Sequence, residues 1–533
     1  MTAQLKKFCQ QIELDRTIDI ELACNIADGK IGLYLGDAAE RRCAASHQRL
    51  VRVIAEKRHV YGITTGFGPL ANRLVSSENG TTLQQNLVHH LASGVGAPFS
   101  WNEARAIVLA RLMSIAQGAS GASTEAISAL LALLNSNLAP VLPSRGTVGA
   151  SGDLTPLAHM VLCFQGRGSF QCDDGSIIDG LAGLAALGIP PLDLSRRDGL
   201  ALVNGTSAMT GVAVLNARAT QRAIEWSLAL TAAMAETMEG RIEAWHGAFG
   251  ALRPHHGQIK AAKILRHRVF GSQRVTTDFI AERRLDAGDF KVETEAGQDA
   301  YTLRCAPQVI GAVWDTATWH DQVVRTELIS VTDNPIFPEA SDSIALHGGN
   351  FMGQHVGLAS DALANALVVL AGLTERQIAR ITDEKLNRGL PAFLHQGPAG
   401  LNSGLMGAQV TATALLAEMR TTGAASTQSI STNGANQDVV SMGTIAARHV
   451  SEKLARLSEI QAILALSVAQ AMDILIEKEP QRPFSQSAQM LHAFIRRYSA
   501  KIDSDRPLGP EIELLAKALK QSSINRSGLA GGL

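Results

Sequence analysis

Apolar residues recur at the spacing of an α-helix along much of this chain. The pattern is clear from Trp101 to Pro140, from 354 to 377 and from 405 to 422, where an apolar residue returns every three or four positions. Alanine is frequent in the last two stretches, which allows helices to pack closely. Residues 163–191 instead hold short alternating segments around DDGS, which predict a small hairpin. The pattern therefore predicts a mainly α protein with a long helix bundle.

The length of 533 residues exceeds the usual size of a single hydrophobic core. It predicts two domains or one elongated helical body. We place the division between an N-terminal domain, residues 1–200, and a long-helix bundle with C-terminal helices, residues 201–533. The formal net charge is −1 and no long run of Lys and Arg occurs. This balance argues against nucleic acid or an anionic membrane as the main partner, so a small-molecule ligand is expected.

Cysteine usage and the N-terminus indicate a cytoplasmic protein. The six cysteines are scattered without CxxC spacing, as expected for reduced thiols. Residues 1–15 are charged and lack an apolar signal region, and no uninterrupted apolar run reaches the length of a membrane span. His89 and His90 are adjacent, so on a helix their side chains diverge and cannot share a metal ion. No metal is expected.

The stretch 146–160, GTVGASGDLTPLAHM, holds the most distinctive chemistry. Gly152 has no side chain to keep its nitrogen from the Ala150 carbonyl in a tight turn. Attack of that nitrogen, followed by loss of water from the new ring and from Ser151, gives 4-methylidene-imidazole-5-one, an electrophile. A bare Ala-Ser-Gly is more often an ordinary turn before a helix. The chain repeats the tripeptide at 119–121, so only the context separates the two copies.

That context resembles the signature of the aromatic amino acid ammonia-lyases and aminomutases. The resemblance continues, in order, in YGITTGFGPLA from Tyr61, LVNGTSAM from Leu202, QDAYTLRCAPQV from Gln298, DNPIF from Asp333, GGNFMGQ from Gly348 and NQDVVSMG from Asn436. It implies the superhelical fold of histidine ammonia-lyase, an elongated helical bundle with a mixed N-terminal domain that carries the electrophile turn. It further implies a homotetramer whose active sites are shared between subunits, with the self-made ring and no external cofactor.

The resemblance also assigns roles to single residues. Tyr61, in a Gly- and Thr-rich loop able to act as a lid, is implied as the base that removes the β-proton, and Tyr301 as a second phenol near the electrophile. A phenolate is basic enough for this, although its reference pKa is about 10. Arg304 offers a planar fork for the substrate carboxylate. The other implied substrate-binding residues are His90, Leu91, Leu200, Asn204, Gln298, Asn334, Phe351, Asn436 and Gln437.

The pair His90-Leu91 bears on the substrate. In the family His-Leu is typical of tyrosine preference, Phe-Leu of phenylalanine and Ser-His of histidine. An imidazole can hydrogen-bond a phenol hydroxyl, and a substrate without that hydroxyl leaves it unpaired. Gln437 stands where histidine ammonia-lyases carry a glutamate, which further weakens the histidine alternative. The resemblance thus implies elimination of ammonia from L-tyrosine to p-coumarate, with weaker use of L-phenylalanine. A phenylalanine ammonia-lyase and a tyrosine 2,3-aminomutase remain alternatives, and a histidine ammonia-lyase is a more distant one.

Two other classes of protein fit the sequence less well. A nucleotide-binding protein could use the glycine-rich turns as phosphate cradles. However, the chain has no G-x-x-x-x-G-K-[ST] and neither turn follows a convincing βαβ pattern. A helical scaffold without catalysis would keep the apolar helices but would have no need of Tyr61, Tyr301 and Arg304 together.

Overall fold

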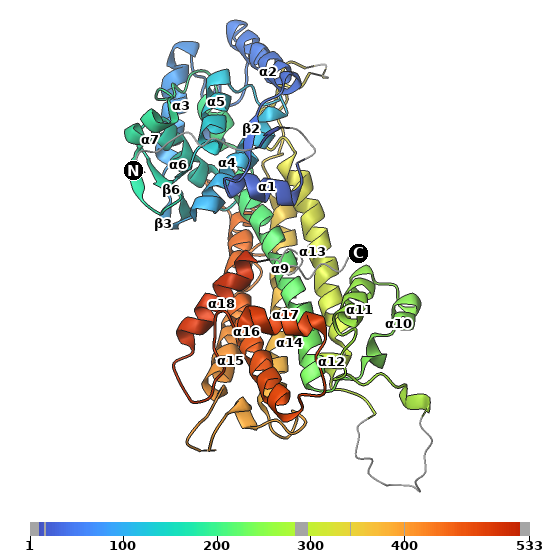
Figure 1. Cartoon of the computed structure of the whole chain (residues 1–533). Coiled ribbons are helices and arrows are strands. Elements are labelled where there is room, and N and C mark those ends of the chain that lie inside the picture. The colour runs from blue at the N-terminus through green and yellow to red at the C-terminus, as the bar shows by residue number, and fades with distance from the viewer. Residues whose placement is uncertain are drawn as a thin grey trace. The chain divides into compact units, whose positions relative to one another are not determined.

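The computed structural model describes residues 10–14, 18–282, 297–339, 341, 343–398 and 400–522. The chain divides into two compact units (Figure 1). The first unit comprises Met1–Arg218, His320–Asp361 and Ala424–His449, and the second comprises Ala219–Trp319, Ala362–Gly423 and Val450–Leu533. Neither unit is one continuous stretch, so the units do not follow the predicted division after residue 200, which stays a prediction.

Helices of the first unit surround small β-elements, and four long helices begin in one unit and end in the other. The helices within the first unit are α1 (Ile20–Ala27), α2 (Asp37–Ala55), α3 (Gly80–Leu91), α4 (Trp101–Ala116), α5 (Thr124–Leu134), α6 (Leu154–Phe164), α7 (Gly180–Leu187) and α8 (Asp198–Val203). The strands are β1 (Gln11–Glu13), β2 (Gly32–Tyr34), β3 (Val95–Pro98), β4 (Leu138–Pro140), β5 (Pro143–Arg145), β6 (Ser169–Cys172) and β7 (Ile177–Asp179). The long helices are α9 (Ser207–Thr237), α13 (Ala306–Leu328), α14 (Gln354–Thr382) and α16 (Gly443–Lys478).

The second unit adds shorter helices to the long ones. These are α10 (Gly247–Leu252), α11 (His256–Arg268), α12 (Tyr301–Arg304), α15 (Met406–Arg420), α17 (Gln486–Ile495) and α18 (Gly509–Gln521). Short 3₁₀ turns lie at η1 (Gly68–Leu70), η2 (Ser77–Asn79), η3 (Ile242–Trp245), η4 (Ile280–Glu282) and η5 (Ala392–Leu394). The helices predicted from apolar periodicity are confirmed.

The predicted hairpin between 163 and 191 is confirmed as well. β6 and β7 pair antiparallel, with Phe170 opposite Ile178, and β4 extends them to a three-stranded sheet. Beside this sheet α4 forms the centre of the first core. Ser100 and Glu103 cap its first turn with a reciprocal capping box. Every residue from 104 to 116 is buried, so α4 is a rigid support for the elements around it.

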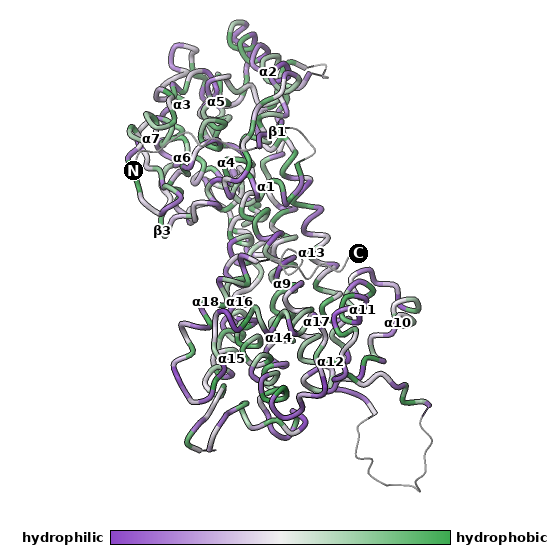
Figure 2. The backbone as a smooth tube through the Cα atoms, in the orientation of Figure 1, coloured by the Kyte–Doolittle hydropathy of each residue, from purple (hydrophilic) through white to green (hydrophobic). Residues whose placement is uncertain are grey.

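In the second unit α9, α14 and α16 pack side by side around an apolar core. Gln377 on α14 donates to the Thr231 hydroxyl on α9 at 2.9 Å. Gln461 on α16 donates to the Ala223 carbonyl on α9 at 2.7 Å. These buried amides are paired across helices, as buried polar groups must be. Figure 2 shows apolar and polar positions interleaved along the helices, as expected for packing around a common core.

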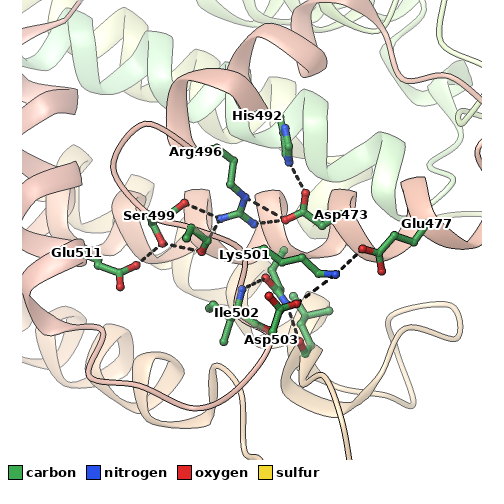
Figure 3. Close-up of polar contacts among 12 residues, drawn as sticks. Asp473, Glu477, His492, Arg496, Ser499, Lys501, Ile502, Asp503 and Glu511 are labelled. Carbon is green, nitrogen blue, oxygen red and sulfur yellow. Dashed lines mark hydrogen bonds and ion pairs between the residues drawn. The ribbon is translucent and has the colours of Figure 1, made fainter.

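A polar network fixes the C-terminal helices to α16 (Figure 3). Asp473 on α16 accepts from His492 at 2.6 Å and from the Nε of Arg496 at 3.0 Å. Burial raises the pKa of Asp473, but the hydrogen bond from His492 and the charge of Arg496 outweigh it, so its pKa is lowered. Lys501 pairs with Glu477 beside this cluster. α17 and the segment that follows it are therefore held by charged contacts as well as apolar packing.

Two helices bear on the prediction of localisation. By length and composition alone, α14 and α16 could each cross a membrane. In the structure, 61% and 72% of their most apolar windows are buried, which is the behaviour of core helices. Among the cysteines within the described residues, Cys24, Cys43, Cys163 and Cys172 are buried. The N-terminal residues 1–9 lie outside the described part of the chain.

Candidate active site

The turn that carries Ala150, Ser151 and Gly152 joins β5 to α6 and is packed tightly on its neighbours. Gly152 has φ +70°, and a Cβ added there would lie 2.1 Å from the carbonyl oxygen of Gly205. The backbone nitrogen of Asp153 donates to that carbonyl at 2.7 Å. Only glycine fits a position with this φ and this contact. Gly152 is therefore a position where the backbone nitrogen must belong to a residue without a side chain.

Two side-chain amides hold Ser151. The Nδ2 of Asn204 donates to the Ser151 carbonyl oxygen at 2.9 Å. The Nε2 of Gln437 donates to the Ser151 hydroxyl oxygen, also at 2.9 Å. The carbonyl oxygen and the hydroxyl oxygen of Ser151 thus each receive a hydrogen bond from a neutral donor. This arrangement joins three segments that are far apart in the sequence.

Asn204 is itself held from two sides. Its side-chain oxygen accepts from the backbone nitrogen of Asn334 at 2.7 Å, and its carbonyl accepts from Arg111. The side chain of Asn334 accepts in turn from the nitrogen of Gly348 at 2.7 Å. Arg111 is fully buried on α4, and burial lowers its pKa to about 10. With its oxygen occupied, the amide of Asn204 has its N–H directed at Ser151.

Gln437 is placed by a short turn. The nitrogen of Thr432 donates to the Gln437 carbonyl at 3.0 Å, and the nitrogen of Gln437 donates back to Thr432 at 3.3 Å. Between them Asn433, Gly434 and Ala435 all have positive φ, which reverses the chain sharply. Asn436, also predicted for the site, is exposed in this turn.

Asp153 anchors the far end of the electrophile turn. It is fully buried, and its carboxylate accepts from the Thr444 hydroxyl and from the Met209 nitrogen at 2.8 Å. Burial raises the pKa of Asp153 to about 6, although these hydrogen bonds lower it. On the other side, the Ser441 hydroxyl donates to the Gly149 carbonyl at 2.9 Å. The turn is thus fixed from both ends.

The loop of Tyr61 is folded back on itself. The phenol oxygen of Tyr61 accepts from the nitrogen of Gly68 at 2.9 Å, and its ring meets Phe67 edge-on at 6.1 Å. A Cβ added at Gly68 would lie 2.8 Å from the Nδ2 of Asn433. The loop therefore lies against the turn that carries Asn436 and Gln437, and Tyr61 belongs to the same region of the first unit as Ser151.

The residues predicted to recognise the aromatic ring of the substrate lie on two helices, α3 and α8, that contact the Tyr61 loop. His90 lies exposed on α3, and its Nδ1 bonds the carbonyl of Asn86 at 2.9 Å. Leu91 packs partly buried against the first core, while Leu200 on α8 is buried. A Cβ added at Gly62 would lie 2.7 Å from Leu200. The loop backbone thus packs closely on the Leu200 side chain.

Three of the predicted site residues lie in the second unit, on and just before α12. Tyr301 is 69% exposed, and the guanidinium of Arg304 lies 4.7 Å from the centre of its ring. Buried Leu303 anchors α12, because its carbonyl accepts from the indole of Trp245 at 3.0 Å. Gln298 borders two adjoining cavities of about 270 and 370 Å³; Arg304 lines the first and Tyr301 the second. Tyr301 and Arg304 share one helix face, as their spacing of three requires.

The structure therefore gathers Ser151, Asn204, Asn334 and Gln437 by hydrogen bonds in the first unit. Phe351 lies half-buried in the turn before α14, in the same unit. Sequence reasoning missed Arg111 and Asp153, which fix Asn204 and the electrophile turn. A signal existed for Arg111, since a charge in the middle of an apolar helix seldom lies buried without a partner.

The second Ala-Ser-Gly, at 119–121, is held in a different way. The hydroxyl of Ser120 donates to the carboxylate of Asp333 at 3.2 Å, and its carbonyl accepts from buried Arg197. Ser120 thus gives its proton to a carboxylate, whereas the hydroxyl oxygen of Ser151 receives an N–H. Loss of a hydroxyl as water is assisted by a donor at its oxygen and opposed by an anion there. The two copies therefore differ in the partner of the serine hydroxyl.

Comparison with known proteins shows the family of this chain. Residues 18–497 match the aromatic amino acid lyase family. The chain belongs to this family and is a carbon–nitrogen lyase. It is 63% identical over 512 residues to a tyrosine ammonia-lyase of Cereibacter sphaeroides, covering 96% of this chain and 98% of that protein. It is 38% identical over 507 residues to a tyrosine ammonia-lyase of Cupriavidus metallidurans, covering 94% of each.

Solved structures agree on the fold. A tyrosine aminomutase from Streptomyces globisporus matches with a TM-score of 0.92 and 36% identity over 97% of this chain and 98% of that one. A histidine ammonia-lyase from Trypanosoma cruzi matches with a TM-score of 0.86 and 28% identity over 97% and 95%. The predicted mainly helical fold of the histidine ammonia-lyase type is confirmed.

Proposed function

We propose that this protein eliminates ammonia from L-tyrosine to give p-coumarate, using an electrophile made from Ala150, Ser151 and Gly152. The observation that carries the proposal is the pair of amide donors at Ser151, one on its carbonyl and one on its hydroxyl. The 63% identity to a tyrosine ammonia-lyase over nearly the whole chain supports the same reaction. No external cofactor is needed for it.

The residues present fit a 4-methylidene-imidazole-5-one ring. Gly152 lies where any side chain would meet Gly205, and its neighbours hold the turn from both ends. Such a ring would supply an electrophilic carbon able to make the substrate amine a leaving group. Gln437 donates to the Ser151 hydroxyl oxygen and so assists its loss as water. Asn204 donates to the Ser151 carbonyl, which lies in conjugation with that carbon, and so draws electron density away from it.

The remaining roles are those that the family resemblance implies. Tyr61 takes the β-proton of the substrate, and Arg304 holds the carboxylate with its planar fork. Holding base and leaving group across one bond supplies part of the rate by orientation alone. Tyr301 provides a second phenol. The substrate pocket is lined by Gln298, Asn334, Phe351 and Asn436. Tyr301 is 69% exposed beside Arg304, which suits a site that neighbouring subunits complete. We propose a cytoplasmic homotetramer with shared sites, as the family resemblance implies.

The tautomer of His90 supports tyrosine as substrate. Its Nδ1 contacts the Asn86 carbonyl. A carbonyl can only accept, so Nδ1 carries the proton and Nε2 of the neutral ring is left as an acceptor. An acceptor at that position pairs with the phenol O–H of tyrosine and has no partner on phenylalanine. Leu91 and Leu200 supply apolar surface for the ring.

The test is incubation of the purified protein with L-tyrosine, L-phenylalanine and L-histidine in separate reactions. The proposal predicts p-coumarate and ammonia as the main products, with less cinnamate from phenylalanine. Dominant formation of urocanate from histidine contradicts the substrate assignment. A second candidate, a tyrosine 2,3-aminomutase, is favoured by the match to the Streptomyces globisporus enzyme. It predicts β-tyrosine in place of free ammonia, which chromatography of the products separates.

A further inference from the structure

Gln84, a residue outside the predicted site, joins two of its parts. Its side chain is fully buried on α3. The Nε2 donates to the carbonyl of Gly62 at 2.9 Å, and the Oε1 accepts from the nitrogen of Leu200 at 2.8 Å. One amide thus bonds the loop next to Tyr61 and the helix that carries Leu200. Both ends of the amide have the partner that their chemistry requires.

The two segments joined by Gln84 lead directly to the reacting groups. Gly62 follows Tyr61 in the chain, and its backbone packs on Leu200 so closely that a Cβ would lie 2.7 Å from that side chain. The carbonyl of Leu200 accepts from the nitrogen of Asn204 at 2.9 Å. Asn204 in turn donates to the Ser151 carbonyl at 2.9 Å. A continuous series of hydrogen bonds therefore runs from the base-bearing loop to the electrophile turn.

The helix that carries Gln84 also carries the pair that reads the substrate ring. Leu91 lies seven residues, about two turns, after Gln84, so both face the same side of α3. Leu87 and Val88 between them are buried and fix the helix to the core. The backbone of α8 also packs closely on that of α3, since a Cβ added at Gly199 would lie 2.8 Å from the Gln84 carbonyl oxygen. Displacement of Gln84 must move the loop, α8 or both.

We propose that Gln84 is a positioning residue that fixes the Tyr61 loop relative to the ring pocket and the electrophile. The proposal rests on the proposed function, because it assigns no chemistry to Gln84 itself. Gln84 sets the distance between the base and the substrate β-carbon through the Gly62 carbonyl. Misplacement of reacting groups by about 1 Å can cost roughly a hundredfold in rate. Substrate affinity depends less on this bond than the proton transfer does.

The test compares Gln84→Glu with the wild type on whichever aromatic amino acid the wild type turns over. The introduced carboxylate still accepts from Leu200 but cannot donate to Gly62. We expect kcat to fall at least tenfold at alkaline pH, with KM changed less than about threefold. Lowering the pH protonates the introduced carboxyl and restores a donor, so the ratio of variant to wild-type kcat is expected to rise. The intact mass should keep the deficit of two waters.

Asn135→Asp is the matched control. Asn135 makes the same kind of two-ended amide contact, accepting from the Leu33 nitrogen and donating to its carbonyl, both at 2.8 Å. It lies in a segment without predicted site residues. This variant is expected to lose stability without a change in kcat or in its pH profile. Gln84→Met, which has no donor at any pH, is expected to show the loss in kcat without recovery.

Several outcomes overturn the proposal. A kcat of Gln84→Glu within twofold of the wild type at all pH values does so, and so does a loss that is independent of pH. If neither Gln84 variant folds, Gln84 contributes to the stability of the fold and the positioning role is rejected. A wild-type protein that converts phenylalanine or histidine rather than tyrosine contradicts the proposed function but leaves this comparison intact.

Discussion

The side-chain amide of Gln437 donates a hydrogen bond of 2.9 Å to the hydroxyl of Ser151. These two residues are 286 positions apart in the chain, and the turn from Thr432 to Gln437 brings them together. Ser120, in the other copy of the tripeptide, has a carboxylate at its hydroxyl instead. We propose that the environment of the hydroxyl, rather than the tripeptide itself, decides which copy cyclises.

Replacing Gln437 by Leu removes the donor at the Ser151 hydroxyl. We expect loss of the Ser151 hydroxyl as water to slow by about twofold to thirteenfold, the worth of one hydrogen bond of roughly 0.5–1.5 kcal/mol. Intact mass spectrometry of freshly expressed protein at successive times measures the fraction that has lost two waters. Gln428→Leu, at an exposed position in the same region, should mature at the wild-type rate. Equal rates for both variants would remove Gln437 from the maturation step.

Asn204→Asp tests the donor at the Ser151 carbonyl. The variant keeps an oxygen for the Asn334 nitrogen but faces Ser151 with a second oxygen, so kcat should fall by about 10²–10³, as for loss of an oxyanion-hole donor. Steady-state kinetics on L-tyrosine measure this. Asn350→Asp is the control, since Asn350 is exposed and donates to the Val331 carbonyl at 3.1 Å. A kcat for Asn204→Asp near that of the control would contradict the role.

His90→Phe removes the acceptor for the substrate phenol. The ratio of kcat/KM for tyrosine to that for phenylalanine should fall by roughly 5- to 150-fold, corresponding to about 1–3 kcal/mol for an unpaired polar group. His89→Phe serves as control, because the Nε2 of His89 bonds Arg167 at 2.9 Å. An unchanged ratio in the His90 variant would place the phenol elsewhere in the site.

The raised pKa of Asp153 predicts that the free energy of unfolding depends on pH. Its pKa in the folded protein is about 6, against an ordinary value of 3.8, because burial disfavours the charged form. Between about pH 4 and 6 the folded protein holds a proton that the unfolded chain has released. This contribution to the free energy of unfolding is fully present below pH 3.8 and is lost as the pH rises through 6.

In Asp153→Asn that dependence disappears. The melting temperature of the wild type minus that of the variant should therefore fall from pH 4 to pH 7, as followed by circular dichroism. Asp174→Asn, in the exposed turn between β6 and β7, should show no such fall. A difference that rises with pH would mean that the hydrogen bonds from Thr444 and Met209 outweigh burial.

Local features of this fold could be predicted from the sequence, and its long-range contacts could not. The helices around Trp101 and Gln354 and the hairpin after Cys163 follow from periodicity, which depends on neighbours in the chain. The contact between Ser151 and Asn204 spans 53 residues, and no local sequence pattern indicates which atoms form the hydrogen bond. Gln84 and Asp153 could not be recognised from the sequence. Gln84 lies in an ordinary helical pattern, and Asp153 lies at an ordinary helix N-cap. Buried polar residues become interpretable only when their partners are known.

The intact mass of three proteins tests the central claim most directly. The wild type and Ser120→Ala should each weigh two waters less than the sum of their encoded residues. Ser151→Ala should show no such deficit and no deamination, with its fold preserved by circular dichroism. A wild-type protein of full encoded mass that still releases ammonia from its substrate would contradict the account, as would a deficit that disappears in Ser120→Ala.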